Sequence, residues 1–290
     1  MAPSKLSNSA NNIYSINPLL VPLSVAIPAA GAALAYLNAK WGISHDLSLI
    51  SALRTMDKQR AHSEKTDTVN AFYALEAWAT SSTHSNRVFM IFEGQQWTYA
   101  QAYDTILRYG TWLKTVKRVV KEEVVAMDFM NSPMFVWVWW GLWAIGAKPA
   151  FINTNLTGTP LLHSVKESSA RLLLIDTNLR DRFSEEVVKE LGSDTFKTGS
   201  KTSVELVFID EILETEIMAT APARPPNEER GGQKCRDMAI LIYTSGTTGL
   251  PKPAVVNWNK ARFAGWTISK LLKFRDNEIY YTVSPPPVPP

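Results

Sequence analysis

The sequence of 290 residues predicts an α/β protein with a largely parallel sheet flanked by helices. Between residues 88 and 242, short apolar runs of strand length alternate with longer segments of helical periodicity. This alternation is typical of a parallel sheet with helices on both faces. An uncharged apolar run from Leu19 to Leu37 adds an N-terminal apolar helix to the prediction.

Composition indicates a globular chain without a nucleic-acid surface. The sequence is 46% hydrophobic, which is ample for a core, and its formal net charge is only +3. We therefore expect no nucleic-acid partner. Cys235 is the only cysteine, which excludes an internal disulfide and a cysteine pair for a metal. We expect Cys235 to be an incidental thiol and predict no metal site.

Residues 1–45 predict a tail with a membrane anchor at about 19–37. No residue from Leu19 to Leu37 is charged, and the run is close to the roughly 20 residues that a helix needs to cross a bilayer. Lys40 and Trp41 follow directly, as an interfacial anchor would. A cleaved signal peptide and a buried helix remain alternatives.

The elements after the anchor follow one another at α/β spacing. An amphipathic connector over 46–65 and a helix over 68–80 come first. Residues 220–236 are rich in Pro and Gly and poor in apolar residues, so they predict an exposed linker. The expected strands are 88–93, 96–98, 124–129, 149–152, 171–175, 204–209 and 238–242, and the expected helices are 99–116, 133–145, 159–167 and 179–191.

Three features have both a structural and a functional interpretation. Residues 135–143 hold four tryptophans within seven positions, which fits a fatty-acyl surface or a membrane-dipping element, but we favour a helix buried between layers. His163 has no second His or Cys at ligand spacing, so we expect a surface or boundary histidine. Asp128 could pair with a cation, and the simpler expectation is a polar strand-end residue.

A loop rich in Ser, Thr and Gly follows the strand expected at 238–242 and is the strongest functional motif. Its glycines permit φ > 0 and let a ligand approach the backbone, its hydroxyls donate hydrogen bonds, and its lysine adds positive charge. A strand-like segment follows, so the loop is a β–loop–β clamp rather than the strand–helix cradle of a P-loop. A hairpin without a ligand is the alternative. The predicted phosphate-binding residues are Thr244, Ser245, Gly246, Thr247, Thr248, Gly249 and Lys252.

The string from Tyr243 to Lys252 resembles the AMP-binding signature of the adenylate-forming superfamily. The stretches 129–132, 143–153 and 155–163 look like one branch of it, the fatty acid transport proteins, which are also very-long-chain acyl-CoA synthetases. The likeness runs from about residue 63 to residue 282. It implies that residues 63–282 form a partial AMP-binding (adenylation) domain, the N-terminal part of an adenylate-forming enzyme.

That resemblance implies a ligase that activates long- or very-long-chain fatty acids to acyl-CoA through an acyl-adenylate, coupled to fatty acid transport. ATP, Mg²⁺ and CoA would be its cofactors and the fatty acid its substrate. Thr244 to Gly249 would hold the β- and γ-phosphates, while Lys252 would offset charge on the departing pyrophosphate. The apolar segment would associate with a membrane, and the catalytic part would face the cytosol at the plasma membrane, endoplasmic reticulum, peroxisome or a lipid droplet. A homo-oligomer is left open.

The last residues depart from the family's pattern. Residues 283–290 contain five prolines in their last six positions, and such a tail cannot continue a central strand. The family's adenine, ribose and Mg²⁺ motifs and its C-terminal lysine are expected beyond Pro290, so the catalytic residues are unknown. The alternative function is a catalytically incomplete, membrane-associated fragment that binds lipid or pairs with a full-length homologue.

Overall fold

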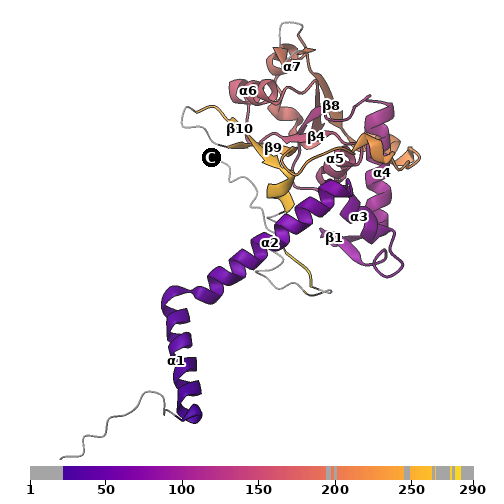
Figure 1. The fold of residues 1–290 in the computed structure, drawn as a ribbon. Coiled ribbons are helices and arrows are strands. Elements are labelled where there is room, and N and C mark those ends of the chain that lie inside the picture. The colour runs from indigo at the N-terminus through magenta and orange to yellow at the C-terminus, as the bar shows by residue number, and fades with distance from the viewer. Residues whose placement is uncertain are drawn as a thin grey trace, which may run out of the picture. The chain divides into compact units, whose positions relative to one another are not determined.

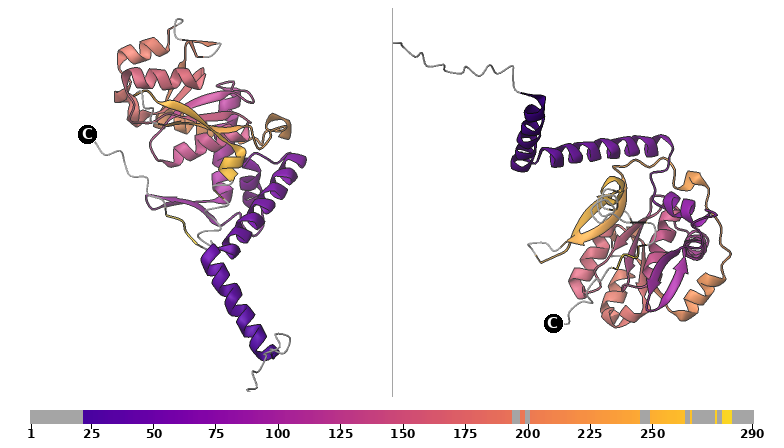
Figure 2. Two further views of the ribbon diagram at one scale, coloured as in Figure 1. Left: turned by 60° about the vertical axis from the view of Figure 1, so that its left-hand side comes forward. Right: turned by 90° about the horizontal axis from the view of Figure 1, so that it is seen from below.

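The computed structural model describes residues 22–193, 197–198, 201–244, 249–262, 265, 275 and 278–281 (Figure 1). The chain divides into two compact units, Met1–Asp57 and Lys58–Pro290. The second unit contains the sheet and the helices that cover it (Figure 2). The predicted proline-rich tail at 283–290 lies outside the described residues.

The described part of the first unit, from residue 22 onward, is helical. α1 (Leu23–Trp41) contains most of the predicted apolar run, which confirms the predicted apolar helix. None of its residues is buried. The helix ends at Gly42, whose φ of 65° lets its N–H donate to the carbonyl oxygen of Asn38 at 2.8 Å. α2 (Ile43–Lys65) follows and confirms the connector helix.

In the part of the chain that the structure describes, no helix combines the length and the apolar character that a bilayer crossing requires. Residues 19–21 of the predicted anchor lie outside the described residues. Membrane association of this segment stays a prediction.

A sheet organises the second unit, and its six described strands follow the order β10-β9-β4-β3-β5-β8. Five of them are parallel, and β10 at one edge is antiparallel to β9. The predicted fold class is confirmed. The strands are β3 (Val124–Asp128), β4 (Lys148–Phe151), β5 (Leu172–Asp176), β8 (Glu205–Ile209), β9 (Met238–Thr244) and β10 (Lys252–Asn257).

Helices cover both faces of this sheet (Figure 2). The alternation along β5 shows the division, because Leu172 and Leu174 belong to one buried cluster and Leu173 and Ile175 to another. The first cluster includes residues of α3 (Phe72–Ala79), α4 (Tyr99–Thr115), α5 (Pro133–Ala144) and α8 (Glu211–Ala219), and the second includes residues of α6 (Gly158–Ser168), the 3-10 helix η2 (Thr177–Arg182) and α7 (Glu185–Leu191).

Several boundaries differ from the prediction for local reasons. The helix expected at 179–191 is two helices, because Ser184 caps α7 by accepting a hydrogen bond from the N–H of Val187 at 3.4 Å. α8 has no counterpart in the prediction, and Asp210 caps it in the same manner through the N–H of Leu213. Two hairpins complete the fold: β1 (Val88–Phe92) with β2 (Gln95–Thr98), and β6 (Lys197–Thr198) with β7 (Lys201–Thr202).

The tryptophan-rich segment forms α5, and the buried-helix interpretation is confirmed. Trp137 and Trp143 are buried, whereas Trp139 and Trp140 are half-buried. α5 packs closely on α4, since a Cβ on Gly141 would lie 3.1 Å from the backbone nitrogen of Gly110. Gly110 and Gly141 let the two helices approach closely where they cross.

The linker expected over 220–236 is largely exposed, as predicted. This segment, the strap, is nevertheless anchored to the rest of the second unit by several buried residues, among them Arg230. Arg230 is only 1% exposed, and its Nη1 donates to the carbonyl oxygen of Ala144 at 2.8 Å. Its guanidinium also lies over the rings of Phe72 and Tyr73, at 4.6 and 4.8 Å from their centroids. Composition alone did not reveal that a buried arginine anchors this segment.

Gly146, at the turn between α5 and β4, allows the strap to approach. Its φ is +75°, and a Cβ there would overlap the carbonyl oxygen of Glu229. Gly94, in the β1–β2 turn, has a similar φ of +82°, but a Cβ there would meet nothing within 4 Å. An alanine at Gly94 would therefore suffer only from the left-handed backbone, whereas an alanine at Gly146 would also clash with the strap.

We predict that Gly146→Ala destabilises the protein much more than Gly94→Ala. The left-handed backbone costs Ala about 1 kcal/mol at either position. At Gly146 the strap must also move, which adds about 2–4 kcal/mol. Urea unfolding followed by tryptophan fluorescence measures both free energies. Equal destabilisation by the two variants would contradict the close packing of the strap on Gly146.

Candidate functional site

The predicted phosphate loop joins β9 to β10, the two antiparallel strands at one edge of the sheet (Figure 1). Lys252 is the register partner of Thr244, so the strand pairing closes immediately beside the loop. The β–loop–β arrangement predicted from the sequence is confirmed. The residues Ser245, Gly246, Thr247 and Thr248 lie outside the described residues.

The three described residues of the predicted site lie at the two ends of this loop. Thr244 and Lys252 are exposed, and the Oγ1 of Thr244 donates to the carbonyl oxygen of Lys252 at 3.4 Å. Gly249 has φ of +81°, and a Cβ there would meet no atom of the described residues within 4 Å. The backbone at Gly249 thus takes the left-handed conformation that the motif anticipated.

α6 fixes both strands of the hairpin. The hydroxyl of Tyr243 on β9 donates to the carbonyl oxygen of Ser164 at 2.7 Å. On the other strand, Nε2 of His163 lies 3.1 Å from the carbonyl oxygen of Pro251, so that nitrogen carries the donated proton. Burial raises the pKa of Tyr243, which keeps its hydroxyl protonated as a donor.

His163, predicted as a surface or boundary residue, is half-buried beside the hairpin. The sequence did not reveal its contact with the loop, because its partner Pro251 lies 88 positions along the chain. The described residues contain no group of three or more His, Cys, Asp or Glu side chains that could hold a metal ion. The structure therefore gives His163 a positioning contact with the loop.

Tryptophans hold the opposite face of β9. Nε1 of Trp143 on α5 donates to the carbonyl oxygen of Ala239 at 3.0 Å, which is a buried hydrogen bond. The Trp143 ring also packs on Trp258, directly after β10, with 4.9 Å between centroids. The hairpin is consequently held from both sides of the sheet.

The carboxyl ends of β3 and β5 form a second polar feature of the sheet. These strands are neighbours, and the connections that leave them cover opposite faces, which is the topological switch point of an open α/β sheet. Asp128 ends β3 and Asp176 ends β5. Asp128 is thus a strand-end residue, as expected, but it is only 1% exposed.

Burial is the main cause of the unusual ionisation of Asp128. Desolvation raises its pKa to about 7, with Arg182 opposing the shift and Asp176 adding to it. Neither carboxyl oxygen has a hydrogen-bond partner among the described residues. A neutral carboxyl group is the form that such an environment favours.

Comparisons with known proteins agree with the loop and the sheet. Residues 75–286 match the family model described as AMP-binding enzyme. The chain belongs to the AMP-binding enzyme family. The match covers the hairpin with its loop and most of the second unit, and it excludes α1 and α2.

The relatives of this AMP-binding chain include fatty acid transport proteins. It is 30% identical to the very long-chain fatty acid transport protein of Cochliobolus heterostrophus, over 91% of this chain and 40% of that protein. It is 34% identical to the very long-chain fatty acid transport protein of Saccharomyces cerevisiae, over 67% of this chain and 29% of that protein. The chain therefore spans well under half the length of these relatives.

Solved structures of other proteins share the fold. O-succinylbenzoate coenzyme A synthetase from Bacillus subtilis, in complex with AMP, has a TM-score of 0.54 and 21% identity over 70% of this chain and 46% of that one. VinN in complex with 3-methylaspartate has a TM-score of 0.53 and 20% identity over 70% of this chain and 52% of that one. At these identities the likeness concerns the fold alone.

We predict that the stability of this AMP-binding chain falls as the pH rises from about 4 to above 7, because of Asp128. A carboxyl group whose folded-state pKa lies above its unfolded value stabilises the fold below the unfolded pKa, and this contribution is lost as the pH rises through the folded pKa. At 1.36 kcal/mol per unit, the loss reaches about 4 kcal/mol at most.

Asp128→Asn removes the ionisation, so its unfolding free energy should change much less over this range. Urea unfolding at a series of pH values provides the measurement. Asp181→Asn is the control, because Asp181 is an exposed carboxylate on η2. A parallel pH dependence of the Asp128→Asn variant and the unmodified chain would show that Asp128 titrates in its ordinary range.

Proposed function

We propose that this chain contributes to the ATP-dependent activation of long- or very-long-chain fatty acids to acyl-CoA. The observation that carries the proposal is the β9–β10 hairpin, which sets Lys252 opposite Thr244 at the ends of the predicted phosphate loop. Membership of the AMP-binding family and similarity to fatty acid transport proteins support it. The activity of a whole protein of this kind is part of the proposal, because the chain spans 40% of the first relative.

The proposed chemistry has two steps. A carboxylate oxygen of the fatty acid bonds to the α-phosphorus of ATP as pyrophosphate leaves, giving an acyl-adenylate. The thiol of CoA then attacks the acyl carbon, a thioester forms, and AMP departs. The first step concentrates negative charge, so backbone N–H groups, hydroxyls and cations must be held in place before it occurs.

The described ends of the loop fit a polyphosphate. No described residue occupies the space where a side chain at Gly249 would place its Cβ, and the left-handed backbone of Gly249 lets a phosphate approach. The exposed ammonium group of Lys252 would offset charge on the β- and γ-phosphates. Ser245 to Thr248 complete the proposed site. Mg²⁺ would accompany ATP, and we assign it to no residue of this chain, because the described residues offer no set of three ligands.

We further propose that α1 contacts a lipid surface. Leu23, Ile27 and Leu34 share one face by their helical spacing and are 76%, 66% and 67% exposed. Lys40 lies over the rings of Tyr36 and Trp41, at 5.9 Å from each centroid, which is a combination typical of membrane interfaces. The ATP-dependent part would then face the cytosol, where ATP and CoA are available.

Lys252→Ala should weaken ATP binding roughly ten- to a hundredfold, as expected for the loss of one charged hydrogen bond. The side chain is exposed, so the melting temperature should remain within a few degrees of the unmodified chain. Equilibrium dialysis with labelled ATP measures the affinity. Lys189→Ala is the matched control, because Lys189 is also exposed and lies on α7, away from the hairpin sequence. Unchanged affinity in the Lys252→Ala variant would sink the proposed role of this lysine.

Incubation of the purified chain with ATP, Mg²⁺, CoA and a labelled very-long-chain fatty acid tests the activity itself. Labelled acyl-adenylate or acyl-CoA would support the proposed ligase. ATP binding without either product would instead favour the alternative of a catalytically incomplete chain that binds lipid or pairs with a homologue.

Ile27→Lys with Leu34→Lys should reduce flotation of the chain with phosphatidylcholine vesicles, because both changes place charge on the exposed apolar face of α1. Asp46→Lys with Asp57→Lys adds charge on α2 and serves as the comparison. Equal flotation of the two double variants would contradict a lipid contact through α1.

A further inference from the structure

A basic pocket lies in the second unit, at the opposite end of the β9–β10 hairpin from the phosphate loop. Its volume is about 460 Å³. The register of the hairpin separates the two ends, since Lys252 pairs with Thr244 beside the loop and Asn257 pairs with Met238 beside the pocket. At about 3.4 Å per residue, the five intervening steps place the pocket roughly 17 Å from the loop. The pocket is therefore a separate feature of the molecule.

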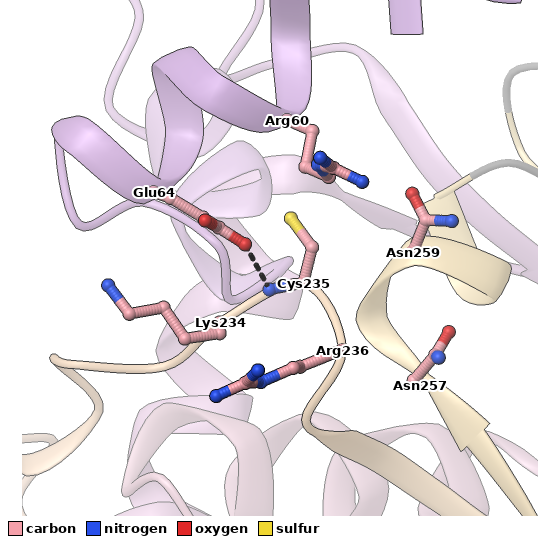
Figure 3. Close-up of a pocket in the computed structure, with 7 residues that line it drawn as sticks. All are labelled: Arg60, Glu64, Lys234, Cys235, Arg236, Asn257 and Asn259. Carbon is pink, nitrogen blue, oxygen red and sulfur yellow. Dashed lines mark hydrogen bonds between the residues drawn. The ribbon is translucent and has the colours of Figure 1, made fainter. Parts of the chain in front are cut away.

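Three segments that are distant in the sequence meet at this pocket (Figure 3). The last turns of α2 contribute Arg60 and Glu64, the strap contributes Lys234 and Arg236, and the residues at the end of β10 contribute the side-chain amides of Asn257 and Asn259.

Positive charge dominates the lining. Three of the lining side chains, Arg60, Lys234 and Arg236, are cationic, and Glu64 is the one lining carboxylate. Glu64 is already engaged, because its Oε1 accepts a hydrogen bond from the backbone N–H of Cys235 at 2.8 Å (Figure 3). This bond lowers the pKa of Glu64, and the nearby charges of Lys234 and Arg60 act in the same direction.

Hydrogen bonds hold the backbone of the pocket in place without a ligand. The N–H of Lys234 donates to Oδ2 of Asp237 at 2.7 Å, so this second carboxylate is also turned to the strap. The N–H of Asn259 donates to the carbonyl oxygen of Cys235 at 2.8 Å, which joins the strap to the end of the hairpin. A site arranged in advance loses less conformational entropy when a ligand binds.

The combination of donors favours phosphate. Arg presents a planar fork of N–H donors that matches phosphate oxygens, and Lys adds a compact charge. Side-chain amides donate to oxygen and also accept from a hydroxyl, so Asn257 and Asn259 suit a polar group next to the phosphate. The volume is in the range of pockets that take small organic ligands rather than a bare ion.

We propose that this pocket binds the phosphate group of an organic phosphate monoester. Two sources share that chemistry: a small soluble phosphoester and the headgroup of an anionic lipid. Lys234 and Arg236 supply the charge, and the hydrogen-bonded strap sets their spacing. The site is independent of the ATP-dependent activity proposed above.

The test replaces two lining cations with neutral side chains of similar length, as Lys234→Gln with Arg236→Gln. Both side chains are exposed, so the double variant should keep its melting temperature. Lys166→Gln with Lys189→Gln removes the same formal charge from exposed positions on α6 and α7 and is the control. The full chain is used throughout.

Calorimetric titration with glycerol 3-phosphate is the soluble arm, and flotation with phosphatidylcholine vesicles with and without phosphatidate is the lipid arm. We expect the pocket variant to bind at least roughly tenfold more weakly in one arm or both, while the control is unchanged. A loss in the titration identifies a soluble phosphoester, and a loss confined to phosphatidate vesicles identifies a lipid headgroup.

Equal binding by the pocket variant and its control in both arms would overturn the proposal, as would an absence of binding by the unmodified chain. Lys252→Ala distinguishes the two phosphate sites, because this variant should retain the binding measured in these arms. If Lys252→Ala alone abolished it, the phosphate loop would be the site and the pocket would not.

Discussion

The buried guanidinium of Arg230 is the contact on which the arrangement of this chain depends. Burial of a cation is costly, and here the Nη1 of Arg230 donates to carbonyl oxygens while two aromatic rings lie against the guanidinium. The contact ties the strap to the end of α5, where Gly146 leaves the space that the strap occupies. Because β9 begins directly after the strap, this attachment also determines where the loop-bearing hairpin starts.

The β9–β10 hairpin then carries two polar features at its two ends, the proposed ATP-phosphate loop and the basic pocket. Its position is fixed by α6 on one side, through Tyr243 and His163, and by Trp143 on the other. An edge hairpin with fewer contacts would open readily, since edge strands have one unpaired side. These contacts suit a loop that must present donors to a polyphosphate in a fixed geometry.

At the carboxyl ends of the central strands, Asp128 is a buried carboxyl group that lowers stability when it ionises. Its side chain is buried without a hydrogen-bond partner among the described residues, next to a second carboxylate at the end of β5. Such a group reduces stability at neutral pH and is retained at the switch point of the sheet, where open α/β folds bind ligands. An electrostatically unfavourable group therefore lies where ligand sites of such folds are usually located.

The sequence by itself determined the α/β class, the order of the central strands and helices, and the β–loop–β form of the phosphate motif. These follow from local information: strand-length apolar runs, helical periodicity, and glycines beside Lys252. Local information correctly predicted that most of 220–236 is exposed, but it did not show that Arg230 anchors this segment. Only the tertiary structure brought Arg230 to Ala144, His163 to Pro251, and Arg60 to the strap. Each of these pairings joins residues more than 80 positions apart, so no single segment of the sequence encodes it.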